Sequence, residues 1–210
     1  AITTAQVVVM LLTHPKALDK VREELRRSTT PTSSASGRRE MKADDLVGGM
    51  PYLELCVHEA LRLTQHSIGS MRKVRCREGF RLVTSEGRAL RIPQGYYVGA
   101  AHALIGRAGF FENAGRFDPE AHFRTNRAGK VVPKTSAERA KNSHVPFSGG
   151  VHACPGSTVA IILIKALVAS WLQLTGDSCA IQQPVPDLDY ERATIAQRKG
   201  PCLLTFRLAA

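Results

Sequence analysis

The chain has 210 residues, of which 43% are hydrophobic, so it is large enough to bury a core of its own. Its formal net charge is +11, but the Lys and Arg residues are spread along the chain and aromatic residues make up only 6% of it. This pattern argues against a nucleic-acid-binding protein and leaves an acidic partner as the better use of the positive charge. The five cysteines include no C-x-x-C pair, which argues against a disulfide framework and a zinc module and fits a reducing compartment.

The first part of the sequence predicts three helices and one polar loop. Residues 4–12 are apolar and suit a helix, which His14-Pro15 ends. Residues 16–27 show a charged amphipathic pattern, and residues 28–37 are rich in Ser, Thr, Pro and Gly, which is typical of a loop. A third amphipathic helix is predicted where apolar residues recur at helical spacing, namely Leu53, Cys56, Val57, Ala60 and Leu61.

Short strands and polar segments follow. Residues 80–83, 90–93 and 95–98 predict strands joined by glycine-containing turns. Residues 126–143 are polar and irregular, and residues 200–208 alternate as a terminal strand does. The chain therefore mixes long helices with small sheets.

The longest apolar stretch covers residues 159–172 and contains Lys165. It is too short for an average membrane span, so we expect a buried helix. The sequence starts at Ala1 without a signal-peptide pattern, which favours a fragment of a longer protein with no membrane anchor visible.

A glycine-rich loop leads directly into this apolar helix and delivers Cys154 to its N-terminus. Gly149 and Gly150 lack side chains where the loop must bend or pass close to a flat, bulky group. The helix dipole favours a thiolate at this place. One thiolate cannot build a four-ligand zinc site, but it can supply the single axial ligand that a haem iron takes from a protein. The alternative is a glycine turn with an inert cysteine.

Phe147, Gly150, Cys154 and Gly156 stand at the spacing F-x-x-G-x-x-x-C-x-G. In this respect the chain resembles the cytochrome P450 family at its haem-binding signature. The resemblance implies a mainly helical α+β fold with small sheets, corresponding to the C-terminal half of a cytochrome P450. Residues 1–210 would then form one partial domain without the N-terminal half.

The resemblance also implies roles for charged residues. Glu59 and Arg62, which alone predict no more than a surface ion pair, match the family's buried pair on its K helix. Arg72 and His152 match positions that bind haem propionates, where a cationic or donor group suits a carboxylate. For both residues, exposure to water is the alternative.

The segment from Gly115 to Phe123 resembles the family's F-x-P-E-R-F motif but departs from it. The arginine expected after Glu120 is replaced by Ala121-His122. That arginine normally closes a triad with the buried Glu–Arg pair. His122 or Arg124 can take its place, or each can face solvent.

The activity implied is that of a haem-thiolate monooxygenase. The cofactor would be haem, iron protoporphyrin IX, with the Cys154 thiolate as axial ligand and Phe147 packed near it. An NADPH-dependent reductase or ferredoxin-type donor would supply electrons, and the substrate would be small and apolar. Thr3 and Thr4 stand about one helical turn too close to His14 for the family's proton-relay alcohol, so no catalytic residue is assigned.

Two alternatives remain open: a haem-thiolate isomerase or dehydratase, and a truncated, non-catalytic P450 fragment. The location would be the cytosolic face of the endoplasmic reticulum, through an anchor outside the chain, or else the cytoplasm.

Overall fold

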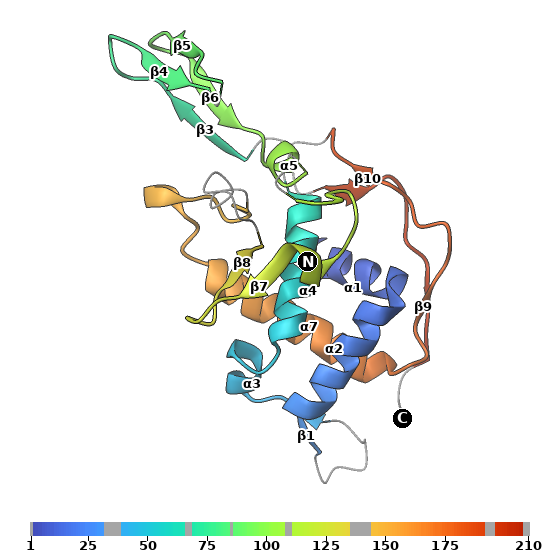
Figure 1. Cartoon of the computed structure of the whole chain (residues 1–210). Helices are drawn as coiled ribbons and strands as arrows, with labels where there is room; N and C mark the ends of the chain where they lie inside the picture. Colours follow the sequence, from blue (N-terminus) through green and yellow to red (C-terminus); the bar gives the residue numbers. More distant parts are fainter. Residues whose placement is uncertain are drawn as a thin grey trace.

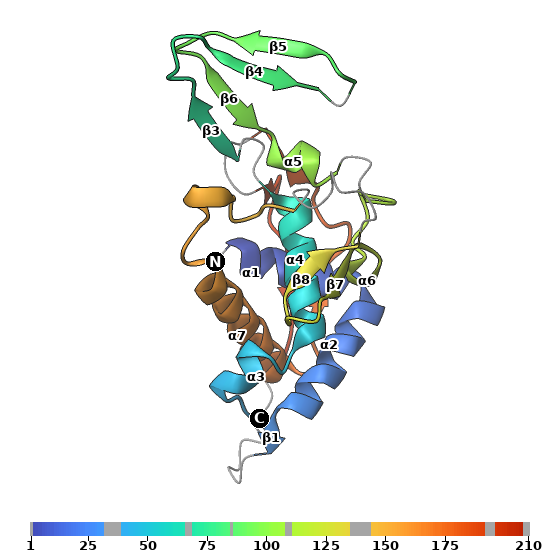
Figure 2. The same cartoon turned by 60° about the vertical axis from the view of Figure 1, so that its left-hand side comes forward.

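The computed structural model describes residues 2–31, 39–65, 69–84, 86–107, 111–134, 144–191 and 196–207. Long helices pack into one body, and a narrow arm of β-strands projects from it (Figures 1 and 2). The predicted fold, mainly helical with small sheets, is confirmed. The loop residues 32–37, the polar segment 135–143 and Leu208 of the predicted terminal strand lie outside the described residues.

Helices α1 (Ile2–Thr13) and α2 (Pro15–Ser28) meet at a break between Thr13 and Pro15. Proline lacks a backbone N–H and suits the first position of a helix, so Pro15 ends one helix and begins the next. Both helices bury their apolar faces in a common core with α4 (Pro51–Thr64). The two N-terminal helices predicted from the sequence are confirmed to within two residues at either end.

Helix α4 begins where a carboxylate from α2 caps it. Glu24 accepts hydrogen bonds from the backbone N–H groups of Tyr52 and Leu53, at 2.6 and 2.8 Å. These groups have no partner within a helix, so a carboxylate placed there stabilises both the helix end and the α2–α4 contact. Burial raises the pKa of Glu24, and the two backbone hydrogen bonds oppose that rise.

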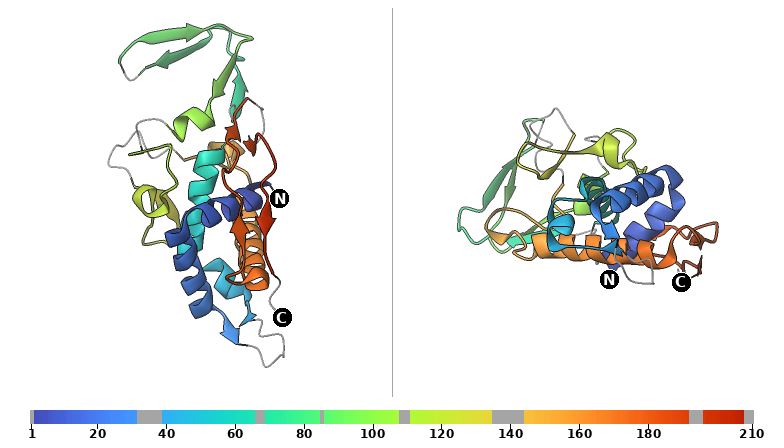
Figure 3. Two further views of the ribbon diagram at one scale, coloured as in Figure 1. Left: turned by 90° about the vertical axis from the view of Figure 1, so that its right-hand side faces the viewer. Right: turned by 90° about the horizontal axis from the view of Figure 1, so that it is seen from below.

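Helix α7 (Ser157–Thr175) crosses the body beside α1 and α4 (Figure 3). Within the described residues, α7 is the single helix that is long and apolar enough to cross a membrane. One side of it is nevertheless buried in the core, and Lys165 on that side pairs with Glu54 of α4 at 3.0 Å. The expectation of a buried helix holds for this side alone, because Val159, Leu163 and Leu167 remain 59%, 55% and 53% exposed.

The arm consists of two antiparallel strand pairs. Strand β3 (Ser70–Lys73) pairs with β6 (Tyr97–Ala100), and β4 (Phe80–Val83) pairs with β5 (Ala89–Ile92). The predicted strands are present, but β6 begins two residues later than expected, and β3 is a further strand. The short helix α5 (His102–Ile105) joins the arm to the body.

Smaller elements complete the chain. Helix α3 (Ala43–Val47) and helix α6 (Pro119–His122) are each a single turn or little more. Residues 126–134 were expected to be irregular, but β8 (Val131–Pro133) pairs with β7 (Phe123–Thr125) across a turn. The remaining pairs are β1 (Thr30–Pro31) with β2 (Arg39–Glu40), β9 (Ala180–Ile181) with β12 (Leu204–Thr205), and β10 (Leu188–Asp189) with β11 (Gln197–Arg198).

Candidate functional site

The Cys154 loop closes on itself through backbone hydrogen bonds. The N–H of Cys154 donates to the carbonyl oxygen of Phe147 at 2.9 Å, and a 3₁₀ turn, η2 (Gly150–His152), lies between them. The carbonyl oxygen of Cys154 accepts from Ser157, the first residue of α7, at 3.3 Å. The loop therefore presents an exposed, free thiol just before the helix begins.

Backbone conformation explains only one of the two neighbouring glycines. Gly150 has φ +64°, a left-handed conformation that suits glycine, whereas Gly149 is extended and a Cβ there would meet no atom within 4 Å. Within the protein, the bend accounts for Gly150, and the expected close approach of Gly149 to a flat, bulky group stays a prediction. Ser148 holds the second left-handed position, with φ +64°. Its hydroxyl group lies 2.9 Å from that of Ser70 on β3, which links the loop to the arm.

A cavity of about 440 Å³ lies beside the loop. Its walls come from α1, α4, α7 and the Cys154 loop, and its lining includes Phe147, Leu163, Leu167 and the two threonines, Thr3 and Thr4. Most of these side chains are apolar. Two buried polar atoms of lining residues, Thr4 Oγ1 and Gln65 Oε1, have no hydrogen-bond partner within the described structure. The cavity is thus a largely apolar slot, and two of its lining residues carry buried polar atoms without a protein partner.

A second cavity, of about 690 Å³, lies between the arm and the loop. Arg72 lines it together with Ser148 and Gly149, and His102 lines both cavities. Arg72 is exposed, and its Nη1 donates to the carbonyl oxygen of Met71 at 2.9 Å. His152 is also exposed, on η2. The structure therefore brings Arg72 to the loop, while His152 faces solvent at its outer turn.

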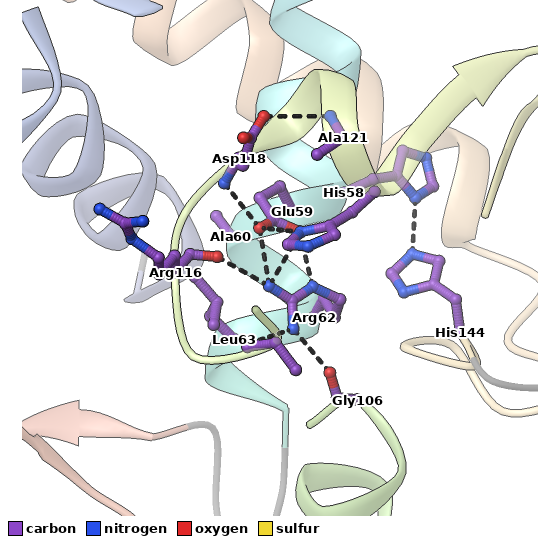
Figure 4. Close-up of polar contacts among 12 residues, drawn as sticks. His58, Glu59, Ala60, Arg62, Leu63, Gly106, Arg116, Asp118, Ala121 and His144 are labelled. Atoms are coloured by element: carbon purple, nitrogen blue, oxygen red, sulfur yellow. Dashed lines mark hydrogen bonds and ion pairs between the residues drawn. The ribbon is translucent and has the colours of Figure 1, made fainter. Parts of the chain in front are cut away.

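Glu59 and Arg62 form a buried ion pair on α4, and both side chains are 0% exposed (Figure 4). The guanidinium uses all five of its N–H groups. Nε and Nη2 donate to the Glu59 carboxylate at 2.6 and 2.7 Å, and the other three hydrogen bonds go to carbonyl oxygens of Gly106, Ala114 and Arg116. The pair is therefore not the surface pair that its spacing alone suggests. It fastens α4 to the segment that follows α5.

His122 lies against the same carboxylate. Its Nδ1 is 2.8 Å from Glu59 Oε1, and its Nε2 is 2.6 Å from the carbonyl oxygen of Glu112. Both of these atoms are acceptors, so they favour the charged imidazole, in which both ring nitrogens donate, whereas Arg62 Nη2, 3.3 Å from Nδ1, opposes the charge. Burial lowers the pKa of His122, but the hydrogen bonds to Glu59 and Glu112 outweigh burial and raise it above its ordinary value. Arg124, the other residue considered for this place, is exposed.

Sequence patterns did not single out several residues that surround the loop. Gln65 and His102 are buried and line the first cavity. His144, three residues before Phe147, contacts His58 of α4. A lone histidine or glutamine carries no signal in a sequence, and for His144 only its nearness to the cysteine motif could have drawn attention to it.

The sequence and the structure of this chain were compared with those of known proteins. The sequence model of the family described as Cytochrome P450 matches residues 1–202. Cytochrome P450 26B1 of Danio rerio is 28% identical over 85% of this chain and 31% of the relative. Obtusifoliol 14-alpha demethylase of Triticum aestivum is 28% identical over 78% of this chain and 34% of the relative.

The solved structure described as retinoic acid bound cyanobacterial CYP120A1 has the same fold, with a TM-score of 0.71 at 22% identity over 99% of this chain and 43% of that one. The chain spans about a third of the length of the two curated relatives. Its membership is shown by the family match, which covers nearly all of its residues. The chain belongs to the cytochrome P450 family.

Proposed function

We propose that this chain supplies the cysteine-ligand side of a haem-thiolate monooxygenase. Such an enzyme inserts one oxygen atom from O2 into a small apolar substrate, using electrons from an NADPH-dependent reductase or a ferredoxin-type donor. The observation that carries this proposal is the free, exposed thiol of Cys154, at the end of a loop whose Phe147 lines an apolar cavity. The proposed unit is residues 1–210 as one partial domain of the family.

The residues around the loop fit haem. A flat apolar macrocycle with two carboxylates needs one axial ligand, apolar walls and cationic or donor groups at its edge. Cys154 would supply the thiolate, the exposed apolar side of α7 a wall, and Arg72 and His152 the partners of the carboxylates. Gly156 follows directly after Pro155 at the start of α7, and a Cβ there would make only an ordinary contact with the Cys154 sulfur, at 3.9 Å, so its place in the motif is what assigns it to the haem site.

Bound haem supplies the activation of O2, and an electron-rich thiolate ligand favours cleavage of the O–O bond. The chain's own residues prepare the site. Phe147 and the leucines of α7 would form an apolar wall against bound haem, which would limit the access of water to it.

The proposed substrate class and location rest on the cavity walls and on the state of the cysteines. The apolar walls of the 440 Å³ cavity support an apolar substrate. Cysteines without disulfide partners support a reducing compartment. We place the protein on the cytosolic face of the endoplasmic reticulum or free in the cytoplasm, and fractionation of cells expressing the tagged protein would decide between the two.

The test is the difference spectrum of the reduced, carbon monoxide-bound protein after reconstitution with haem. We expect a red-shifted Soret band that reports thiolate ligation, and we expect Cys154→Ala to abolish it. Cys76→Ala is the matched control, since Cys76 is also exposed and free but lies on the arm. A red-shifted band that persists in Cys154→Ala would overturn the proposal.

A further inference from the structure

A hydrogen bond between two imidazoles joins the base of the Cys154 loop to α4. His58 Nδ1 lies 2.8 Å from His144 Nε2, across 86 residues of sequence (Figure 4). His58 directly precedes Glu59, and His144 comes three residues before Phe147. The bond therefore connects the helix that carries the buried Glu59–Arg62 pair with the loop that carries the cysteine.

The surroundings make this bond a neutral one between a donor and an acceptor. The ring of Phe123 lies 4.6 Å from that of His144 and 6.0 Å from that of His58, between centroids. Burial, with a smaller effect of the Lys165 charge, lowers the pKa of His58 to about 4. Burial, followed by electrostatic interactions with His58 and Arg62, also lowers the pKa of His144 well below its ordinary value. In such surroundings an unmade hydrogen bond leaves a partly buried polar nitrogen unsatisfied.

The loop has few other side-chain hydrogen bonds to the rest of the described chain, although Phe147 also packs against the core. Among the described residues, the segment from His144 to Cys154 makes side-chain hydrogen bonds to the rest of the chain at two points. His144 contacts His58, with Gln65 at 3.5 Å, and Ser148 contacts Ser70. These two points flank Phe147, whose carbonyl oxygen accepts the closing bond from Cys154.

We propose that His58 and His144 are positioning residues, which hold the Cys154 loop against α4 and thereby fix where the thiol is presented. The inference rests on the proposed function, because a fixed position of the Cys154 sulfur matters when that sulfur is a metal ligand. It concerns the loop itself, however, and so it can be tested in the haem-free protein.

The first measurement is hydrogen exchange at the loop amides that are bonded within the loop, those of Ser148, Ala153 and Cys154. The variants are His58→Phe, His144→Phe and the double variant. Each keeps an aromatic ring beside Phe123 but removes the imidazole bond. A net hydrogen bond of this kind corresponds to roughly a five- to tenfold change in opening, so we expect loop exchange to accelerate by that factor in all three variants. Exchange within α7 should stay unchanged.

His14→Phe is the matched control, because His14 is also partly buried against a phenylalanine ring, at 4.9 Å, but lies at the α1–α2 junction. The double variant separates positioning from simple loss of stability, because it leaves no imidazole unsatisfied. Loop exchange at the wild-type rate in the double variant would overturn the inference. So would an acceleration shared equally by α7, which would mean a general packing defect.

The second measurement is the fraction of red-shifted Soret band in the haem-reconstituted, reduced, carbon monoxide-bound protein. We expect all three variants to lose part of this band while the His14 control keeps it. A wild-type protein without the band would refute the proposed function, and the exchange data would still decide whether the pair holds the loop. A red-shifted band at wild-type strength in the variants would refute the claim that this pair positions Cys154. The proposed haem-thiolate function would be unaffected.

Discussion

Replacing Glu59 by Gln removes the anion from the buried network of α4 while keeping its shape. The carboxylate accepts hydrogen bonds from Arg62 Nε at 2.6 Å, Arg62 Nη2 at 2.7 Å, His122 Nδ1 at 2.8 Å and the backbone N–H of Asp118 at 2.9 Å. An amide keeps one of the two oxygens and turns an NH2 group toward the guanidinium. Arg62, fully buried, then lacks a counter-charge.

We expect this variant to lose about 3–5 kcal/mol of the free energy of unfolding, the cost typical of removing one partner from a buried ion pair. That is a large part of the stability of an ordinary domain, which is about 5–15 kcal/mol. The assay is urea unfolding followed by circular dichroism. A loss below about 1 kcal/mol would mean that the pair behaves as an exposed one, and would refute the reasoning.

The chain offers a matched control in Glu23→Gln. Glu23 and Arg26 have the same spacing on α2, with Arg26 Nη2 3.0 Å from Glu23 Oε2, but their side chains are 45% and 59% exposed. Water already solvates both charges, so this substitution should leave stability almost unchanged. A comparable loss in both variants would show that burial is not the cause.

The pH dependence gives a second check. The pKa of His122 is raised in the folded protein above its ordinary value of 6.5, so its protonation stabilises the fold fully below that value and stops doing so as pH rises through the folded pKa. Glu59→Gln removes the main acceptor that raises this pKa. The stability difference between wild type and variant should therefore be larger below pH ~6.5 than in alkaline solution.

Three further predictions concern the loop and its neighbours. Ser148→Gly and Ser148→Ala both remove the hydroxyl group, but only glycine relieves the left-handed conformation, which costs of order 1 kcal/mol. The glycine variant should therefore unfold at a higher urea concentration than the alanine variant. The reverse order would contradict the conformational argument. Because the pKa of His58 is about 4 when folded and 6.5 otherwise, the unfolded state binds more protons between these values. The free energy of unfolding should therefore fall by roughly 3 kcal/mol in all as pH drops through this range, and this slope should shrink in His58→Phe. Gly69→Ala places a Cβ about 2.0 Å from the His102 ring, so a clear drop in thermal stability is expected, and an unchanged melting temperature would show that His102 moves freely.

The main helices and the cysteine loop could be predicted from the amino-acid sequence. Apolar spacing along the chain reflects which side of a helix meets the core, and Pro15 and Pro51 mark helix starts because proline lacks an N–H. The loop residues from Phe147 to Gly156 carried a specific motif, which is why the family could be named before the fold was known. These patterns involve residues close together in the sequence, so they can be recognised without knowledge of the tertiary structure.

Contacts between residues far apart in the sequence became visible in the folded chain alone. The Glu59–Arg62 spacing is equally compatible with a surface pair, and burial became visible only when the segment after α5 wrapped its carbonyl oxygens around the guanidinium. His122 contacts the Glu59 carboxylate, where the resemblance to the family leads one to expect an arginine. The imidazole bond between His58 and His144 joins residues 86 positions apart, and no periodicity in a chain encodes such a contact. It arises because the core packs α4 against the cysteine loop.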